Sequence, residues 1–505
     1  MTAESSASAT LVTAIGQRRI ASALAVGSIL IGVLIAVGGF AAGAVLVCIG
    51  LGLSGFVDRR LPILLMFVML PMVAAFDDLS LTSVAGGSLS FRLLMTGGIV
   101  FAIGSWLLRD RVRPDPIGIV LLGFVVLLVA LAPLNQIAPV HALPVIGRWA
   151  AYALAYLAGR RWFGSSSDFS MLVAALIVGM IVPAISGLIQ LASGTAPAST
   201  GFRIAGVYGL SPVSLALAMQ VAGLALVGGQ LLRRRPASRL DWLAIGVLVV
   251  MVFVLVETAT RLVFASFVAA WLMVELLHRR PKALPVILLG TALVLVMQSS
   301  LMDRIASVIP QPISTPVIAP SGAAPSGAAP SGVEASPAQP GDVVTTGDPS
   351  LRYRLYVWSS MIPEWLESPI LGRGTGSFAA LFEAKSGHVG NAPHNDYLGV
   401  LVETGVVGLL AYLAIQLAVI IALARRAIGK AGTGRTIAII ALAEFLALAV
   451  LNSINNAMLF LDGQLVVWVI VGSALSQGPS SGRPASQRPS DRRDASVVER
   501  ATQAS

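Results

Sequence analysis

The chain has four histidines, and one of them, His394, stands where an imidazole could act as a base. It directly precedes Asn395 and Asp396, which open an apolar run typical of a membrane helix. Because either residue can cap that helix, the positive end of the helix dipole points at the imidazole and disfavours its protonated form. A neutral imidazole can accept a proton from a hydroxyl group near neutral pH. The alternative interpretation is a histidine that only caps the helix or is solvated.

Nine basic residues are predicted to lie on or at the membrane face of His394, and three of them, Arg203, Arg261 and Arg354, come from three separate outer segments. A guanidinium group stays charged and presents a planar fork of donors that matches the oxygens of an anion. Together the three could bind an anionic group and stabilise charge that develops on it. For each arginine the alternative is a side chain that snorkels to the membrane surface, or one that neutralises a helix C-terminus.

An acidic residue and two glycines follow on the same predicted helix. Glu403 comes two helical turns after Asp396, which places it too far along the helix to be the partner of His394. We expect Glu403 to have a structural role, either pairing with an arginine or capping a neighbouring helix. Gly405 and Gly408 are expected to permit close helix packing.

Metal ligands and disulfides have little support in the sequence. The single cysteine, Cys48, lies in an apolar run, so neither a disulfide framework nor a cysteine metal site can form within the chain. The adjacent Asp77 and Asp78 could hold a hard divalent cation. Two aspartates at a membrane boundary are more often solvated, so we expect a site without a metal and without a cofactor.

The elements that position these side chains must be membrane helices, because the composition excludes a water-soluble fold. Of the 505 residues, 56% are hydrophobic and 11% charged, and the mean hydropathy is +0.85. A soluble domain carries about 25% charged residues. The net charge of +10 would favour nucleic-acid binding in a soluble protein, but here the basic residues follow the predicted topology, so no nucleic acid is expected. A cleaved signal peptide is excluded because the apolar stretch 20–57 is far too long.

Apolar runs predict an all-α, polytopic membrane protein with twelve to fourteen transmembrane helices. The pair 242–256 and 262–277 could instead form one re-entrant unit. The predicted spans are residues 20–38, 39–57, 61–76, 93–108, 116–133, 144–159, 170–191, 211–231, 242–256, 262–277, 283–300, 396–424, 436–452 and 462–476.

The basic residues orient these spans. With residues 1–19 in the cytoplasm, most of the 34 lysines and arginines fall in cytoplasmic segments, as the positive-inside rule requires. Residues 20–300 then hold the first eleven helices, and residues 301–395 form a large periplasmic loop between late helices. Residues 396–476 hold the last three helices, and residues 477–505 form a basic cytoplasmic tail that is expected to be disordered.

The large loop has two halves of unlike composition. Residues 310–350 repeat a Pro-Ser-Gly-Ala-Ala unit and cannot build a core, which predicts a disordered insert. Residues 351–395 carry aromatic and apolar side chains at helical spacing. This ordered half is expected to include an amphipathic helix at the outer membrane interface.

Four short motifs follow one another over some sixty residues at the end of this loop. They are Arg-x-x-x-Trp from Arg354, Pro-x-Leu-Gly-x-Gly-x-Gly-x-Phe from Pro369, His-Asn-x-x-Leu from His394 and Glu-x-Gly-x-x-Gly from Glu403. In this order, beside a large outer loop, they resemble the O-antigen ligase and polymerase family. The stretches around Arg203 and Arg261 are similar to that family's earlier arginine segments.

The resemblance implies a GT-C-like membrane glycosyltransferase that is independent of metals and acts in surface polysaccharide assembly. It would move a glycan from an undecaprenyl diphosphate carrier to a sugar hydroxyl at the periplasmic face of the bacterial inner membrane. Its partners would be the carrier-linked donor, a glycan or lipid A-core acceptor, and membrane lipids. The resemblance implies a catalytic base at His394, donor diphosphate ligands at Arg203, Arg261 and Arg354, and motif residues of structural role at Asn395, Glu403, Gly405 and Gly408.

Other functions remain open at this point. A ligase and a polymerase share the donor chemistry and differ in the acceptor, which the sequence does not name. A transporter or flippase of lipid-linked glycans is the alternative from another class, and it would favour paired halves with charged or broken mid-span segments. The sequence has no convincing internal repeat. A non-enzymatic scaffold would leave the outer histidine and arginines without a role.

Overall fold

The fold is described from a computed structural model of the chain, in which helices dominate. The structure describes residues 50, 52–74, 80–84, 87–136, 139–196, 203–208, 211–232, 239–279, 287, 349–386 and 393–476.

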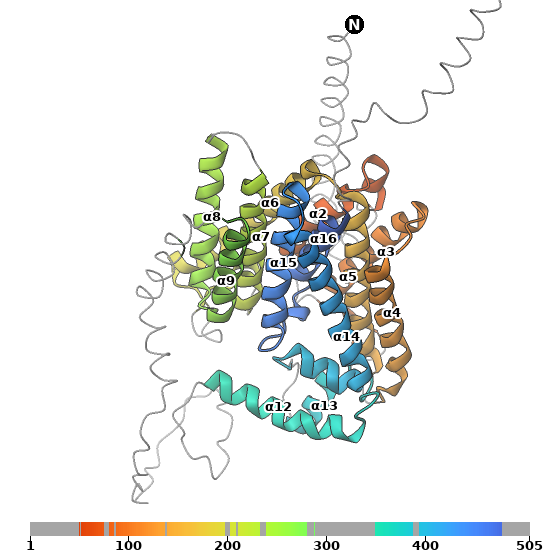
Figure 1. Ribbon diagram of the computed structural model, residues 1–505. Helices are drawn as coiled ribbons and strands as arrows, with labels where there is room; N and C mark the ends of the chain where they lie inside the picture. The colour runs from red at the N-terminus through yellow and green to blue at the C-terminus, as the bar shows by residue number, and fades with distance from the viewer. Residues whose placement is uncertain are drawn as a thin grey trace, which may run out of the picture.

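The described helices form a bundle with two further helices across one end (Figure 1). The bundle contains α2 (Leu61–Ala74), α3 (Phe91–Arg109), α4 (Pro116–Leu131), α5 (Ala142–Trp162), α6 (Ser166–Ser193), α7 (Pro212–Leu232), α8 (Arg239–Glu257), α9 (Arg261–Leu277), α14 (Asp396–Ile428), α15 (Thr433–Leu451) and α16 (Leu461–Ser476). The crossing helices are α12 (Pro349–Glu367) and α13 (Ser377–Ser386), and four short 3-10 turns are η1 (Ala132–Leu134), η2 (Pro139–His141), η4 (Gly206–Tyr208) and η6 (Ala457–Leu459).

The all-helical, multi-pass class is confirmed. Within the described part of the chain, five helices are long and apolar enough to cross a membrane: Pro116–Leu134, Ser166–Ser193, Pro212–Leu232, Asp396–Ile428 and Thr433–Leu451. Shorter apolar helices are Val100–Arg109 and Gly463–Ser476. The helices α8 and α9 are separate elements of 19 and 17 residues. The spans predicted before residue 57 and at 283–300 fall almost entirely outside the described residues, so the total of twelve to fourteen stays a prediction.

Helices α5 and α16 form a tightly packed pair near the centre of the bundle, because small residues let their backbones approach. A Cβ added to Gly159 of α5 would lie 2.3 Å from the carbonyl oxygen of Val469. A Cβ added to Gly472 of α16 would lie 2.1 Å from the carbonyl oxygen of Tyr156. Reciprocal glycines of this kind are a common packing device between membrane helices.

Hydrogen bonds between helix termini distinguish the two ends of the bundle. At one end the backbone N–H of Asp396, at the start of α14, donates to the carbonyl oxygen of Asn452, at the end of α15, at 2.7 Å. At the other end Arg426, near the end of α14, donates to the carbonyl oxygen of Leu475 at 3.0 Å. We call the first the α12 end, because α12 and α13 lie across it, and the second the opposite end (Figure 1).

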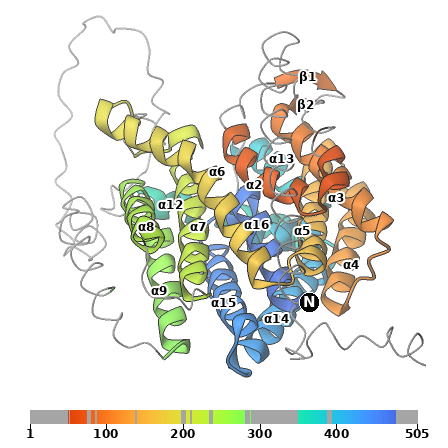
Figure 2. The same cartoon turned by 90° about the horizontal axis from the view of Figure 1, so that it is seen from above.

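Helices α12 and α13 are fixed to each other and to α14. Apolar side chains of all three helices form a small buried cluster that lies apart from the main core and includes Val357, Met361, Phe378, Phe382 and Val402. At its rim, the ammonium of Lys385 lies 2.7 Å from a carboxylate oxygen of Glu364, which is itself buried. Seen from above in Figure 2, both helices are partly covered by the bundle. Within the second half of the predicted outer loop, α12 and α13 are the described helices.

One pair of strands among the described residues was not expected from the sequence. Strands β1 (Ser80–Val84) and β2 (Gly87–Ser90) pair antiparallel between α2 and α3, with Val84 opposite Gly87 and an irregularity between Ser80 and Thr82. In β2 the side chains of Ser88, Leu89 and Ser90 alternate between hydroxyl and apolar, which is the period of a strand, but the adjacent Thr82 and Ser83 break this alternation in β1. The strand pair is too short to change the helical class.

Candidate active site

The site begins where the chain enters α14, at Pro393 and His394. Asn395 is the N-cap of α14, and its side-chain oxygen accepts a hydrogen bond from the backbone N–H of Leu398 at 3.1 Å. His394 has a positive φ of 49°, which is uncommon for a residue other than glycine. Strained backbone of this kind persists only where surrounding contacts hold it, and it often marks a functional residue.

The first of these contacts comes from α12. The indole N–H of Trp358 donates to the carbonyl oxygen of Pro393 at 3.0 Å. One helical turn earlier, Arg354 donates to the side-chain oxygen of Asn455 at 3.4 Å. Because Arg354 and Trp358 lie one helical turn apart, Trp358 contacts the residue before His394 and Arg354 contacts the turn between α15 and α16.

That turn also holds the imidazole. The side-chain nitrogen of Asn456 lies 3.4 Å from Nδ1 of His394, and the ring of Tyr353 meets the imidazole edge to face at 5.8 Å between centroids. His394 and Arg354 thus reach two adjacent asparagines. Residues from three distant segments of the chain meet at this point.

The surroundings of His394 favour the neutral imidazole. Burial lowers the pKa of His394 below its ordinary range, and the positive charge of Arg354 lowers this pKa further. The N-terminus of α14 acts in the same direction, since its dipole disfavours a nearby cation. The group is therefore available as a proton acceptor below the pH at which an ordinary histidine is half protonated.

The asparagine turn is tied to the start of α14 by a buried carboxylate. Asp396 is 6% exposed, and its side chain accepts a hydrogen bond from the backbone N–H of Met458 at 2.9 Å. Its own N–H donates to the carbonyl oxygen of Asn452 at 2.7 Å. These bonds fix the distance between His394 and the turn that carries Asn455 and Asn456.

The glycine-rich motif packs on a break in α14. Gly405 has a φ of 63° and interrupts the helix. The exposed backbone groups around the break are satisfied by the glycine segment, since Gly374 donates to the carbonyl oxygen of Glu403 at 3.0 Å and Val406 donates to that of Pro369 at 2.9 Å. A Cβ on Gly405 would lie 2.2 Å from the carbonyl oxygen of Ile370. Gly405 thus serves a loop-to-helix contact rather than the helix packing that we expected.

The other side of the glycine segment contacts the connection between α4 and α5. A Cβ on Gly374, whose φ is 97°, would lie 2.1 Å from the backbone nitrogen of Asn135. The hydroxyl of the fully buried Thr375 donates to the carbonyl oxygen of Leu128 at 2.8 Å, and the backbone carbonyl oxygen of Thr375 accepts from the side-chain nitrogen of Asn135 at 3.1 Å. The motif therefore joins α4, α5 and α14 beneath the site.

Glu403 and Gly408 have local structural contacts. The carboxylate of Glu403 accepts a hydrogen bond from the backbone N–H of Phe378 at 3.4 Å, in the first turn of α13. This is the capping of a neighbouring helix, one of the two roles expected for it. Gly408 leaves room for Thr404 of the same helix, because a Cβ there would lie 1.8 Å from the Thr404 hydroxyl.

Arg203 and Arg261 lie on segments of their own at the α12 end. Arg261 is the first residue of α9, whose far end is marked by His278, 3.3 Å from the hydroxyl of Thr436 at the start of α15. The two helices are therefore antiparallel, and Arg261 lies at the end where α15 leads into the asparagine turn.

Arg203 precedes η4 in the connection from α6 to α7. Gln190 of α6 holds this connection by accepting hydrogen bonds from the backbone N–H groups of Ala205 and Gly206, at 3.0 and 2.8 Å. Gly228, near the end of α7, packs on Ile440 in the first half of α15, so α7 also runs antiparallel to α15. The connection that carries Arg203 therefore lies at the α12 end.

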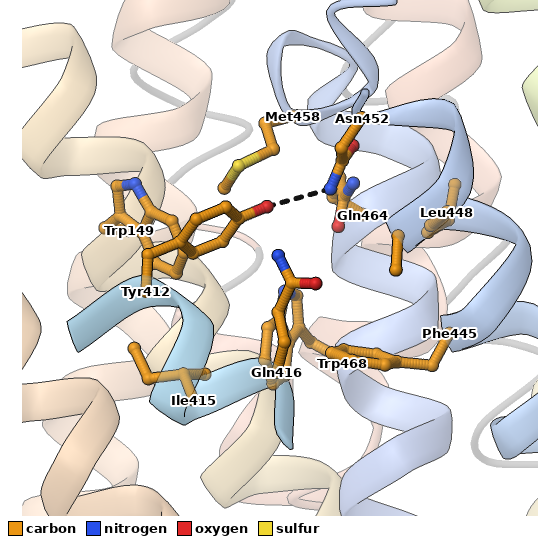
Figure 3. A pocket seen from close by; sticks show the side chains of 11 residues that line it. Trp149, Tyr412, Ile415, Gln416, Phe445, Leu448, Asn452, Met458, Gln464 and Trp468 are labelled. Carbon is orange, nitrogen blue, oxygen red and sulfur yellow. Dashed lines mark hydrogen bonds between the residues drawn. The ribbon is translucent and has the colours of Figure 1, made fainter. Parts of the chain in front are cut away.

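A small cavity lies deeper in the bundle, between α14, α15 and α16 (Figure 3). Tyr412 and Asn452 are hydrogen-bonded at 2.9 Å on its wall. The side-chain nitrogen of Gln416 is buried and has no hydrogen-bond partner among the described residues. The cavity volume of about 20 Å³ fits a water molecule and no substrate.

The described residues offer no cluster of metal ligands. No three His, Cys, Asp or Glu side chains in this part of the chain lie close enough together to hold a metal ion. Asp77 and Asp78, the alternative metal ligands, lie outside the described residues.

Sequence reasoning missed Asn455 and Asn456, which contact Arg354 and His394. A signal was present, because Asn452, Asn455 and Asn456 fall within one short stretch between two apolar helices. All three are buried, with exposed fractions of 5%, 8% and 6%. Buried amides at a membrane boundary need partners, and here two of those partners are Arg354 and His394.

The fold and this site together define a multi-pass helical membrane protein with a histidine and an arginine held at one end of its bundle. Residues 246–413 match the family model described as O-antigen ligase (Wzy_C), so the chain carries an O-antigen ligase domain there. The matched stretch covers about a third of the chain and includes Arg261, Arg354 and His394, but not Arg203. No curated protein matches the chain. Over residues 246–413 the chain is thus similar to O-antigen ligases.

Proposed function

We propose that the chain transfers a glycan from an undecaprenyl diphosphate carrier to a sugar hydroxyl, with His394 as the general base. In this step the acceptor oxygen bonds to the anomeric carbon while the bond from that carbon to the diphosphate oxygen breaks. The acceptor's proton passes to the imidazole, and the negative charge stays on the leaving diphosphate. The family match to residues 246–413 supports a lipid-linked glycan as the substrate class.

The observation that carries this proposal is the meeting of His394 and Arg354 at the adjacent residues Asn455 and Asn456. Each contact measures 3.4 Å, so base and guanidinium belong to one small region at the α12 end. A base without a nearby cation could not stabilise the leaving group, and a cation alone could not accept the acceptor's proton.

Arg354 is the arginine that we assign nearest to the reacting bond, and Arg203 and Arg261 are assigned to the rest of the diphosphate. All three lie at the α12 end, and planar guanidinium groups bind phosphate oxygens in pairs. Arginines alone can stabilise the departing charge, so the proposed reaction does not require a metal ion.

The α12 end is proposed to face the periplasm across the bacterial inner membrane. The distribution of basic residues supports this orientation, since Arg425, Arg426 and Arg435 gather at the opposite end. Positive charge of this kind marks the cytoplasmic side of membrane proteins. The carrier's glycan would then meet His394 after it has crossed the membrane.

The test is to identify what accumulates in a strain that lacks the protein and is complemented with variants. Wild type and His141→Ala should restore surface polysaccharide, because the exposed His141 side chain lies outside the proposed machinery. His394→Ala should not restore it. One carrier-linked repeat unit accumulating would identify a polymerase, and long carrier-linked chains would identify a ligase. Accumulation on the cytoplasmic face would instead indicate a flippase and contradict the proposal.

A further inference from the structure

A second polar cavity lies at the opposite end of the bundle, far from His394. It has a volume of about 350 Å³ and opens between the turn joining α3 to α4 and the last turn of α5. It is lined by Asp110, Arg111, Val112, Arg113, Leu157, Arg160 and Arg161. Four of these seven residues are arginines, so the cavity is strongly basic.

The carboxylates near this cavity are already engaged. Asp110 pairs with Arg59 at 3.3 Å and accepts a hydrogen bond from the indole of Trp162 at 3.1 Å. Asp115, beside the cavity, pairs with Arg160 at 2.8 Å and accepts the hydroxyl of Tyr156 at 2.8 Å. Neither acid therefore offers its charge to the remaining arginines.

Three of the four arginines that line the cavity remain available to bind an anion. Arg111, Arg113 and Arg161 are exposed, and none of them has an ion-pair or side-chain hydrogen-bond partner among the described residues. Arg111 also has a positive φ of 49° at the end of α3, a position that normally favours glycine. Three guanidinium groups lining one cavity create a positive potential that attracts a phosphate group.

The surroundings of the cavity favour a phosphate that carries hydrocarbon chains. Leu108, just before the α3–α4 turn, is 80% exposed, and Ile119, one turn into α4, is 58% exposed. Helix α4 is one of the five helices long and apolar enough to cross a membrane, and these exposed apolar side chains lie beside the cavity at the end of α3 and the start of α4. A basic pocket between transmembrane helices at the cytoplasmic side is suited to an anionic lipid head group.

We propose that this cavity binds the phosphate head group of an anionic phospholipid, with its acyl chains along the apolar surface of α3 and α4. Arg111, Arg113 and Arg161 hold the phosphate. Arg160, paired with Asp115, also lines the cavity. The bound lipid thereby links the α3–α4 turn to the end of α5, whose other end packs on the glycine segment of the active site through Gly376.

The test compares phospholipid binding by the full-length protein in neutral detergent, with phosphatidylglycerol as the probe and phosphatidylcholine as the uncharged comparison. The test variant is Arg111→Gln/Arg113→Gln/Arg161→Gln. The control, Arg279→Gln/Arg425→Gln/Lys430→Gln, removes the same charge from exposed residues at the ends of α9 and α14, elsewhere on the same end of the bundle. Native mass spectrometry reports retained lipid, and titration reports the affinity.

Wild type and control should retain phosphatidylglycerol in preference to phosphatidylcholine. The test variant should bind phosphatidylglycerol about a hundredfold more weakly, because each arginine contributes about a fivefold gain in affinity. Equal binding by test variant and control would overturn the proposal. Complete displacement of the lipid from wild type by inorganic phosphate would also overturn it, since the cavity would then be a site for free anions. Because wild type alone distinguishes the two lipids, the proposal stays testable even if the triple variant does not fold.

Discussion

Trp358 donates its indole N–H to the carbonyl oxygen of Pro393 at 3.0 Å, and this bond joins α12 to the residue directly before His394. The two residues lie far apart in the sequence, and their contact joins α12 to the segment that carries His394. A tryptophan one turn after Arg354 sets the position of the histidine, while Arg354 itself reaches Asn455. The base and the cation are thus placed by one helix.

Replacing Trp358 with phenylalanine should slow glycan transfer by about ten- to a hundredfold, because a small displacement of a reacting group is costly. The ring volume is largely kept while the bond to Pro393 is lost. The matched control is Trp365→Phe, which removes an indole bond of 3.2 Å to Pro369 two turns later on the same helix. Initial transfer rates at equal protein should fall far more for the first variant. Equal rates in the two variants would show that the bond to Pro393 does not position His394.

Replacing Asn456 with aspartate should move the acid limb of the pH–rate profile to higher pH. A carboxylate beside Nδ1 favours the imidazolium form, which raises the pKa of His394, whereas burial and Arg354 lower it in the native protein. The base is active only when neutral, so the midpoint of the acid limb should move to higher pH by about one unit or more. Asn456→Ala adds no charge and should reduce the rate without this upward shift. An unmoved limb in the aspartate variant would separate Asn456 from the base.

Gly374→Ala should destabilise the protein by about 2 kcal/mol or more, because the position combines a positive φ with backbone in the way of a side chain. The new Cβ would lie 2.1 Å from the nitrogen of Asn135, at a φ of 97°. Gly123→Ala is the control, since nothing lies within 4 Å of its Cβ position in α4. Thermal unfolding in detergent should show a lower midpoint for the first variant only. Unchanged stability of Gly374→Ala would contradict the close contact between the glycine segment and the α4–α5 connection.

Transfer should persist when divalent cations are removed. Arginines supply the positive charge in the proposed reaction, so the purified protein should retain its rate in excess chelator after dialysis. Loss of activity that returns on adding a divalent cation would favour a metal at Asp77 and Asp78 instead. Asp77→Asn/Asp78→Asn then tests whether that dependence belongs to these two residues.

The sequence predicted much of the fold, because long apolar runs and the 3.6-residue period are local signals. Helices such as α6 and α9 begin and end within a few residues of the expected bounds. The start of α14 at Asp396, with Asn395 as its cap, was also visible locally. The contacts that assemble the site were not local. Arg354 meets Asn455 across 101 positions, and Thr375 meets Leu128 across 247.

Two kinds of residue escaped prediction for a physical reason. In the sequence Gly405 is a small residue in an apolar run, and only its backbone conformation, with a φ of 63°, shows that it breaks α14. Asn455 and Asn456 carry no charge and fit no periodic pattern, so their partners could not be inferred before the ends of α14 and α15 were seen together. Single amides that serve as contacts between motifs are found from geometry and not from spacing.

The most direct measurement is the rate of glycan transfer by purified protein in liposomes that contain a carrier-linked donor. Wild type, His394→Ala and His141→Ala are compared at equal amounts of folded protein and at several pH values. We expect His141→Ala to match wild type, with an acid limb below the ordinary histidine pKa, and His394→Ala to show no transfer above background at any pH. Transfer by His394→Ala at the wild-type rate would contradict the assignment of His394 as the base.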